Sequence, residues 1–117
     1  MLPKQYRLKK QAAFNATYKV KNSTQKSGIT LFAGKEKENT ETPTKVGFVV
    51  SKKTHKRAVR RNRLKRLMRE SYRLLLKSGE LANSQKYMSL IFIGHEHALN
   101  KNFDEISNII KTLLERI

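Results

Sequence analysis

The chain has 117 residues, which suits one compact domain with a modest core and is too short for two domains. Its 26 Lys and Arg residues against 9 Asp and Glu residues give a formal net charge of +17, which predicts a polyanionic partner. The hydrophobic fraction of 38% excludes a purely disordered basic tail, and the absence of cysteine excludes disulfides and thiolate metal sites. We therefore expect a single folded domain over residues 1–117.

Composition leaves nucleic acid, an anionic membrane surface and an acidic protein open as partners. The longest apolar runs, at residues 48–50 and 90–93, are far shorter than the roughly 20 residues that span a bilayer. Residues 1–7 have no apolar stretch after their charges, so they do not resemble a secretory signal. The sequence thus predicts a cytoplasmic protein without a transmembrane segment.

A helix and a strand are predicted in the first third of the chain. Phe14 and Tyr18 are four residues apart within the Lys-rich stretch 9–20 and would share one face of a helix. Residues 28–33 are rich in β-branched and aromatic side chains and are bounded by polar residues, a pattern typical of a strand. Residues 34–45 are polar and include a proline, which predicts a loop to the next strand.

Two further strands are predicted at residues 45–51 and 86–94. In the first of these, Val46, Phe48 and Val50 would lie on one face of a sheet and the residues between them on the other. We expect the strand at 45–51 to be the central one.

Two helices are predicted in the second half. In the helix at 57–76, the stripe that would pack on a sheet comprises Leu64, Leu67, Met68, Ser71 and Leu75, and Gly79 follows as a typical helix end. A closing helix runs from Phe103 to Ile117, with Asn102 and Glu105 resembling a capping box at its start. The order α-β-β-α-β-α predicts an α/β (α+β) sandwich around a small sheet.

The helix at 57–76 and the residues just before it have the densest charge in the chain. Between residues 52 and 73 there is one acid, Glu70, and eleven basic residues: Lys52, Lys53, Lys56, Arg57, Arg60, Arg61, Arg63, Lys65, Arg66, Arg69 and Arg73. Like charges four residues apart cost about 0.2–0.5 kcal/mol per pair, so a helix that only covered a sheet would avoid them. A partner that supplies phosphates explains why they are tolerated; a solvated basic face is the alternative.

Helical geometry places the polar and apolar residues of this helix on opposite faces. At about 100° per residue, the side chains opposite the apolar stripe are Asn62, Arg66, Arg69 and Arg73. Arg outnumbers Lys seven to one between residues 57 and 73, and guanidinium groups bind phosphate with two parallel hydrogen bonds. The excess of Arg favours nucleic acid over a membrane surface and does not distinguish DNA from RNA.

Two segments carry a resemblance to a known family. Residues 49–53, Val-Val-Ser-Lys-Lys, and residues 58–70, Ala-Val-Arg-Arg-Asn-Arg-Leu-Lys-Arg-Leu-Met-Arg-Glu, together resemble the signature of the bacterial ribonuclease P protein family. In that family an Arg-Asn-Arg element opens a long basic helix after a Ser-Lys-Lys strand end, and residues 61–63 match it. The resemblance covers nearly the whole chain, including the Arg-Leu-Lys-Lys start at residues 7–10.

The resemblance implies a fold similar to that of small ribosomal proteins. It has a left-handed β-α-β crossover, made here of strand 46–50, helix 57–76 and strand 89–93. Such connections are right-handed in most proteins, so the handedness follows from the resemblance alone.

The resemblance also implies two RNA surfaces. The helix face that would bind the catalytic RNA comprises Arg60, Arg61, Asn62, Arg63, Lys65, Arg66, Arg69 and Arg73. A cleft between the first helix and the sheet would hold the 5′ leader of precursor tRNA and comprises Phe14, Tyr18, Phe32, Lys52 and Lys53. From spacing alone, aromatic residues four positions apart are more often part of the hydrophobic core than of a binding site.

The chain departs from the family after the third strand. Where the family tends to have basic residues, this sequence has His95, Glu96 and His97, so we assign no leader contact there. These residues are also the only clustered candidates for zinc, and an exposed loop is the simpler interpretation.

No catalytic site is recognisable in the chain itself. It has no carboxylate pair or cluster at motif spacing, and no Ser/His/Asp or Cys/His arrangement. The resemblance implies that Mg²⁺ ions, held mainly by the RNA subunit and the substrate, activate the attacking water, and that the protein binds no metal of its own. The implied partners are ribonuclease P RNA and precursor tRNA, in a 1:1 complex with a monomeric protein, with no role for DNA or a membrane.

Three other functions remain open. A structural RNA-binding protein of the ribosomal type would have no role in cleavage. A DNA-binding protein would insert the basic helix into a major groove, although no heptad seam or second recognition motif is visible. A protein nuclease would need an acidic cluster that the sequence lacks.

Overall fold

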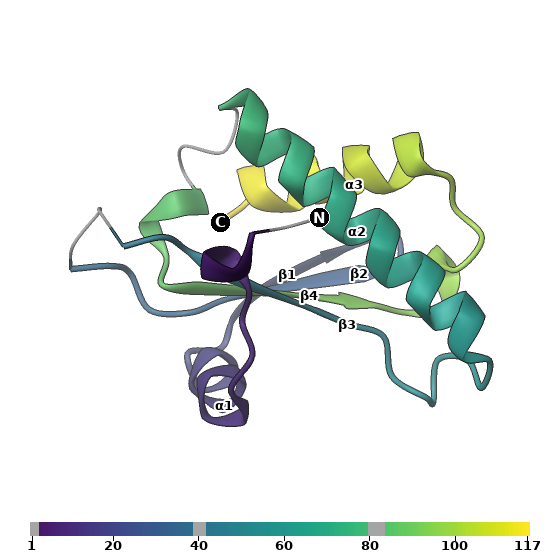
Figure 1. Ribbon diagram of the computed structural model, residues 1–117, viewed down its shortest axis with the longest axis horizontal. Helices are drawn as coiled ribbons and strands as arrows, with labels where there is room; N and C mark the ends of the chain where they lie inside the picture. Colours follow the sequence, from purple (N-terminus) through teal and green to yellow (C-terminus); the bar gives the residue numbers. More distant parts are fainter. Residues whose placement is uncertain (1–2, 39–41, 80–83) are drawn as a thin grey trace.

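The computed structural model describes residues 3–38, 42–79 and 84–117 of the chain, and these form one mixed sheet with helices on both faces (Figure 1). The strand order is β1-β2-β4-β3, in which β1/β2 and β2/β4 are antiparallel and β3/β4 are parallel. The strands are β1 (Asn22–Lys26), β2 (Ile29–Ala33), β3 (Lys45–Val49) and β4 (Ser89–Gly94).

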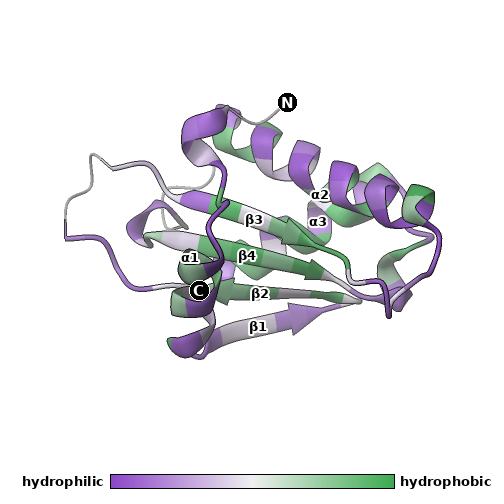
Figure 2. Cartoon of the chain, turned by 60° about the horizontal axis from the view of Figure 1, so that its bottom comes forward, coloured by the Kyte–Doolittle hydropathy of each residue, from purple (hydrophilic) through white to green (hydrophobic). Residues whose placement is uncertain are grey.

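The helices divide unequally between the two faces of the sheet. One face carries α1 (Gln11–Lys19), and the other is covered by α2 (Ala58–Ser78) and α3 (Phe103–Glu115) (Figures 1 and 2). Three short 3-10 helices complete the fold: η1 (Lys4–Tyr6), η2 (Ser84–Lys86) and η3 (Glu96–Ala98). Among the described residues, no helix has both the length and the apolar character needed to cross a bilayer.

The connection from β3 through α2 to β4 is left-handed, as the resemblance implies. In Figure 1 both strands point to the right, β3 lies nearer the viewer, and α2 runs back above the sheet. Figure 2 shows the same relation with β3 above β4 and α2 behind them. This handedness is the rare one for parallel strands, and it sets α2 over the β3 side of the sheet.

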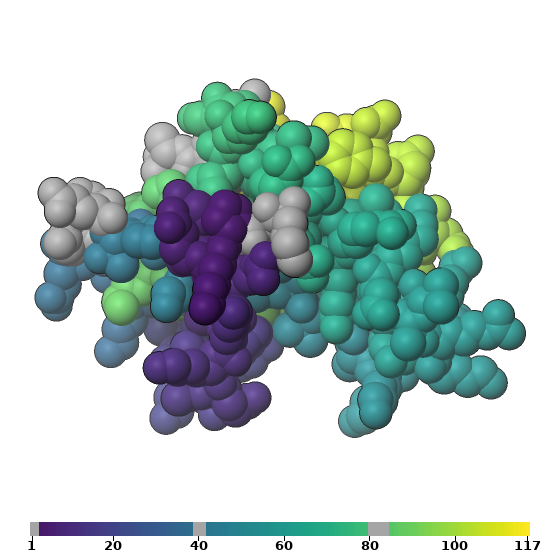
Figure 3. Space-filling model, in the orientation of Figure 1, coloured from purple at the N-terminus to yellow at the C-terminus, as the bar shows by residue number. Residues whose placement is uncertain are grey.

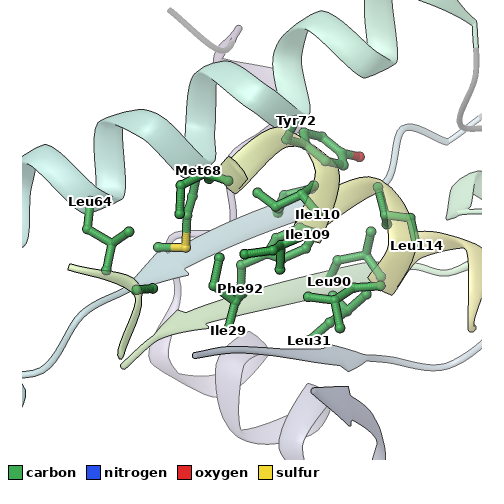
Figure 4. Close-up of a cluster of buried hydrophobic side chains, with 14 of the residues drawn as sticks. Ile29, Leu31, Leu64, Met68, Tyr72, Leu90, Phe92, Ile109, Ile110 and Leu114 are labelled. Carbon is green, nitrogen blue, oxygen red and sulfur yellow. The ribbon is translucent and has the colours of Figure 1, made fainter. Parts of the chain in front are cut away.

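The core lies between the sheet and the pair α2 and α3. Because side chains alternate along a strand, Leu31 and its register partner Phe92 point toward these helices. They meet buried side chains of α2 and α3, among them Leu64, Met68, Tyr72, Ile106 and Ile110 (Figure 4). The predicted stripe of the long helix is therefore confirmed at Leu64, Met68 and Ser71, and the structure adds Tyr72 to it.

Both predicted helix boundary signals are confirmed. Gly79 follows α2 with φ 78°, a left-handed conformation that glycine adopts without strain. At the start of α3, the Glu105 N–H donates to Asn102 Oδ1 at 2.9 Å, and the Asn102 N–H donates to Glu105 Oε1 at 3.2 Å. These two bonds form the expected capping box.

Two predictions about the sheet were wrong. Strand β1 was not expected, because its polar residues show no apolar alternation. A two-residue turn joins β1 to β2, and both of its residues, Ser27 (φ 49°) and Gly28 (φ 90°), have left-handed backbone conformations. Strand β3 was expected at the centre, and it lies at an edge. Its apolar residues are explained by helices on both faces and by the N-terminal segment, whose Leu8 N–H donates to Val46 O at 2.9 Å.

Candidate nucleic-acid interface

The predicted basic face lies on α2, opposite the core. Asn62 and Arg66 are exposed, and Lys65, Arg69 and Arg73 are half-buried along the sides of the same helix. Val59, 79% exposed, lies on the same outer face near the start of the helix. The helix therefore buries one face in the core and presents a basic face to solvent, as its sequence pattern predicts.

Two of the predicted RNA-binding arginines, Arg61 and Arg63, are hydrogen-bonded to backbone carbonyls of the protein itself. Arg61 Nη1 donates to His55 O at 2.7 Å and to Lys56 O at 2.9 Å. Arg63 donates to the backbone carbonyls of Leu99, at 3.0 Å, and Lys101, at 3.2 Å. These bonds fasten the start of α2 to the connection before it and to the connection between η3 and α3.

Arg60 joins the same arrangement. Its Nη2 donates to the Asn100 side chain, so Arg60 and Arg63 hold α2 to one short segment, residues 99–101. We call Arg60, Arg61 and Arg63 the arginine staple. Sequence analysis did not separate these residues from the RNA-binding set, because the three partners of Arg63 and Arg60 lie 36–40 residues away along the chain.

Arg73 is paired with an acid on its own helix. Its guanidinium donates to both carboxylate oxygens of Glu70 at 3.0–3.3 Å, and these hydrogen bonds hold the pKa of Glu70 below its usual value. The side chains of the remaining predicted residues make no hydrogen bond or ion pair with the residues that the structure describes; these residues are Asn62, Lys65, Arg66 and Arg69. We call these four the open set, since their donors are available to a partner.

The predicted aromatic residues come together on the other face of the sheet. The rings of Tyr18 and Phe32 are 5.0 Å apart at 88°, an edge-to-face contact. Partial burial raises the pKa of the Tyr18 phenol. Phe14 lies against Gly47, where an added Cβ would be 2.6 Å from its ring, so the glycine permits this close approach. Beneath them, Thr17 is buried and shares a hydrogen bond of 2.6 Å with Ser89.

Helix α1 covers only part of its face of the sheet. Figure 2 shows it across one end, with the other end and the apolar part of β4 uncovered. Thr30, Val49 and Ile93 are half-buried on this open part. The space-filling view is indented between α1 and the loop before α2, which dips to the α1 side of the sheet (Figures 1 and 3). This indentation lies on the side of the sheet where the sequence predicts the cleft (Figure 3).

Lys52 and Lys53 are exposed in the loop between β3 and α2. Tyr18 and Phe32 are in ring contact beside α1, and Phe14 lies on the same face of the sheet against Gly47, two strands away from Phe32. The staple residue Arg61 holds the loop between β3 and α2, because its carbonyl partners belong to His55 and Lys56.

His95 follows β4 at the open end of the same face. It is exposed, and its Nε2 and Thr30 Oγ1 share a hydrogen bond of 2.9 Å. In the described parts of the chain, no three His, Asp or Glu side chains gather as a metal-ligand set.

Comparisons with known proteins agree on one family. The Ribonuclease P family model matches residues 2–117. The ribonuclease P protein component of Clostridium kluyveri is 34% identical over 111 residues, covering 95% of this chain and 93% of that protein. The corresponding protein of Symbiobacterium thermophilum is 35% identical over 115 residues, covering 98% and 93%.

Solved structures give the same result. The ribonuclease P protein of Staphylococcus aureus superposes with a TM-score of 0.74 at 28% identity, covering 97% of this chain and 95% of that one. The Thermotoga maritima protein gives a TM-score of 0.76 at 25% identity, covering 95% and 96%. The chain therefore belongs to the bacterial ribonuclease P protein family, the protein component of the endoribonuclease that matures tRNA 5′ ends and whose catalytic centre lies in RNA.

Proposed function

We propose that the chain binds the catalytic RNA of ribonuclease P through the outer face of α2 and holds the 5′ leader of precursor tRNA in the cleft beside α1. The observation that carries this proposal is the separation of two surfaces by the sheet. Open basic donors lie on α2, and the aromatic cleft lies on the α1 side. One small protein thereby contacts two RNA segments at once.

Fewer residues of α2 are available to bind the catalytic RNA than the sequence predicts. The arginine staple holds α2 in place, and Asn62, Lys65 and above all the exposed Arg66 supply the contacts to the catalytic RNA. Each phosphate that a cation neutralises releases counterions, so binding weakens with salt by about 0.7–0.9 log units per contact for each log unit of salt. The staple arginines contribute mainly by orienting the helix.

The cleft suits single-stranded RNA of variable sequence. Stacking of a base on an aromatic ring is worth about 1–3 kcal/mol and tolerates any base. Tyr18 and Phe32 supply rings at the α1 side, while Lys52 and Lys53 supply charge at the opposite rim. A leader crossing the cleft would thus stack its bases on the aromatic rings at one side and place its phosphates beside the lysines at the other.

The protein's contribution to cleavage is electrostatic. With a net charge of +17, it lowers the repulsion between two RNA molecules and so strengthens the binding of substrate and of Mg²⁺ held by the RNA and the substrate. We infer a 1:1 complex in which the protein is monomeric and the hydrolysis takes place on the RNA subunit.

The test is cleavage of 5′-labelled precursor tRNA at low Mg²⁺ by the RNA alone, the protein alone and the mixture. Cleavage in the mixture only supports the proposal. Cleavage by the protein alone would make it a nuclease, and no stimulation at any salt concentration would favour the structural RNA-binding alternative. Arg66→Ala should weaken assembly with the catalytic RNA, while Lys26→Ala on β1, a matched loss of one charge away from both surfaces, should not.

A further inference from the structure

The outer edge of β3 has a notch between the two proposed RNA surfaces, lined by Phe14 from α1 and by Arg69 from α2. The N-terminal segment runs beside β3 only at the start of that strand. There Arg7 and Val46 form an isolated parallel β-bridge, and the Leu8 N–H donates to Val46 O. The chain then turns away to begin α1. The space left has a volume of about 300 Å³, at the lower end of the roughly 300–1,000 Å³ of small-molecule sites.

The backbone of β3 opens into this notch. The Lys45 N–H points toward β4 and donates to Met88 O at 3.1 Å. The Val46 C=O points the other way, to the outer edge, and accepts from the Leu8 N–H. Because the direction of the peptide groups alternates along a strand, Phe48 presents its N–H and C=O to the same outer edge. A strand edge of this kind offers a donor and an acceptor side by side.

The walls of the notch are aromatic. Phe14 lines it from α1, with its ring set directly on Gly47, and Phe48 lines it from the α2 side of β3. The Phe48 ring is stacked on Phe92 at 5.7 Å, which fixes its position. Phe14 also belongs to the leader cleft, so the notch and the cleft share a wall.

The rim of the notch is cationic. Arg7 and Lys9 line it from the connection between η1 and α1 and Arg69 lines it from α2, and none of the described residues that line it is acidic. Lys9 and Arg69 make no hydrogen bond or ion pair with the described residues. Positive charges converging around an apolar floor fit an anion with an aromatic group attached, and a guanidinium binds phosphate through paired hydrogen bonds.

We propose that this notch binds one unpaired nucleotide of the precursor tRNA leader, with its phosphate at Lys9 and Arg69 and its base against Phe14. An unpaired nucleotide fits because the volume excludes a base pair, and the leader is favoured because Phe14 joins the notch to the leader cleft. This assignment rests on the proposed function. It moves Arg69 from the face that binds the catalytic RNA to the path of the substrate.

The first experiment measures how holoenzyme affinity depends on leader length, compared with mature tRNA. Arg69→Ala and Lys9→Ala should each weaken binding of precursor tRNA with long leaders by about tenfold and lower its salt slope by about 0.7. They should leave mature tRNA binding and assembly with the catalytic RNA unchanged, whereas Arg66→Ala should weaken assembly. Arg69→Lys, which keeps the charge and loses the paired geometry, should fall between wild type and alanine.

The second experiment locates the nucleotide directly. Because the chain has no cysteine, Lys9→Cys provides a single attachment point for a photo-crosslinker. Crosslinks to leader nucleotides support the proposal. Crosslinks to the catalytic RNA, or an Arg69→Ala variant that loses assembly and keeps leader dependence, would overturn the notch and leave the proposed function intact. A wild-type holoenzyme that binds precursor and mature tRNA equally would overturn both.

Discussion

Neighbouring arginines of α2 have different roles because their guanidinium groups lie on different sides of the helix. Arg63 is turned toward the η3–α3 connection and donates to two backbone carbonyls, whereas Arg66, one turn on, is exposed. Hydrogen bonds from a charged donor are worth about 1.5–3 kcal/mol each when they are sheltered from water, and less near the surface. Similar residues in one run of sequence therefore stabilise the fold in one case and leave their donors open to a partner in the other.

This division predicts opposite phenotypes for two alanine variants. Arg63→Ala should lower the free energy of unfolding by about 1–3 kcal/mol, because both carbonyl contacts are lost. Arg66→Ala should change it by no more than about 0.5 kcal/mol, as is usual for surface positions, and should weaken assembly with the catalytic RNA. Denaturant unfolding and RNA binding measure the two effects; equal stability of the two variants would contradict the staple.

Tyr72 gives the molecule a pH-dependent contribution to stability. Burial raises the pKa of Tyr72 to about 12, from about 10 in an unfolded chain. Because the folded state holds this proton more tightly, the stabilisation is complete below about pH 10 and is lost as the pH rises through about 12.

The corresponding variant is Tyr72→Phe, which keeps the ring and loses the hydrogen bond that Gln85 donates to the hydroxyl at 3.2 Å. Between about pH 10 and 12, the free energy of unfolding should fall by roughly 2 kcal/mol more in the wild type than in the variant. Parallel curves across this range would show that Tyr72 does not titrate on unfolding.

The helices and strands differ in how well their own residues predict them. Helices α2 and α3 have clear periods and end signals, so their extents follow from local residues. Strand β1 is polar throughout and is held by pairing with β2, and the edge position of β3 depends on the order of strands that are distant in sequence. Local patterns do not contain that information.

The candidate site shows the same limit. The resemblance identified Phe14, Tyr18 and Phe32, and the structure places Tyr18 against Phe32 and Phe14 against Gly47 on the same face of the sheet. The arginine staple and the β3 notch were not predicted, because both depend on backbone groups of other segments. Side-chain type is visible in a sequence, whereas the carbonyl that a guanidinium will meet is set by the tertiary fold.

The β1–β2 turn offers a test at the level of an element. Gly28 and Gly79 both have a positive φ, but an added Cβ on Gly28 would lie 2.7 Å from Ala98 N, whereas Gly79 has nothing within 4 Å. Gly79→Ala should cost about 1 kcal/mol of unfolding free energy from the backbone alone. Gly28→Ala should cost about 1–3 kcal/mol more, since the turn must also move away from η3. Thermal unfolding of the two variants measures the difference, and equal losses would rule out the clash.

At the scale of the whole molecule, the charge of +17 opposes the fold. The 26 basic residues repel one another most strongly in the compact state, and salt screens that repulsion over about 10 Å at 0.1 M and about 3 Å at 1 M. The midpoint of thermal unfolding should therefore rise between these NaCl concentrations, as scanning calorimetry would record. A falling midpoint would mean that attractive ion pairs outweigh the repulsion. Bound RNA should stabilise the protein for the same reason.

Helix α1, which forms one wall of the cleft, is held less firmly than α2 and α3. This helix buries a single side chain, Thr17, whereas α2 buries four and α3 five. Elements with few buried contacts open first, so α1 amides should exchange with deuterium fastest of the three helices and become protected when a leader is bound. The wall that we propose meets the bases is thus compliant, and it can move to admit purines and pyrimidines alike while the rest of the scaffold stays rigid.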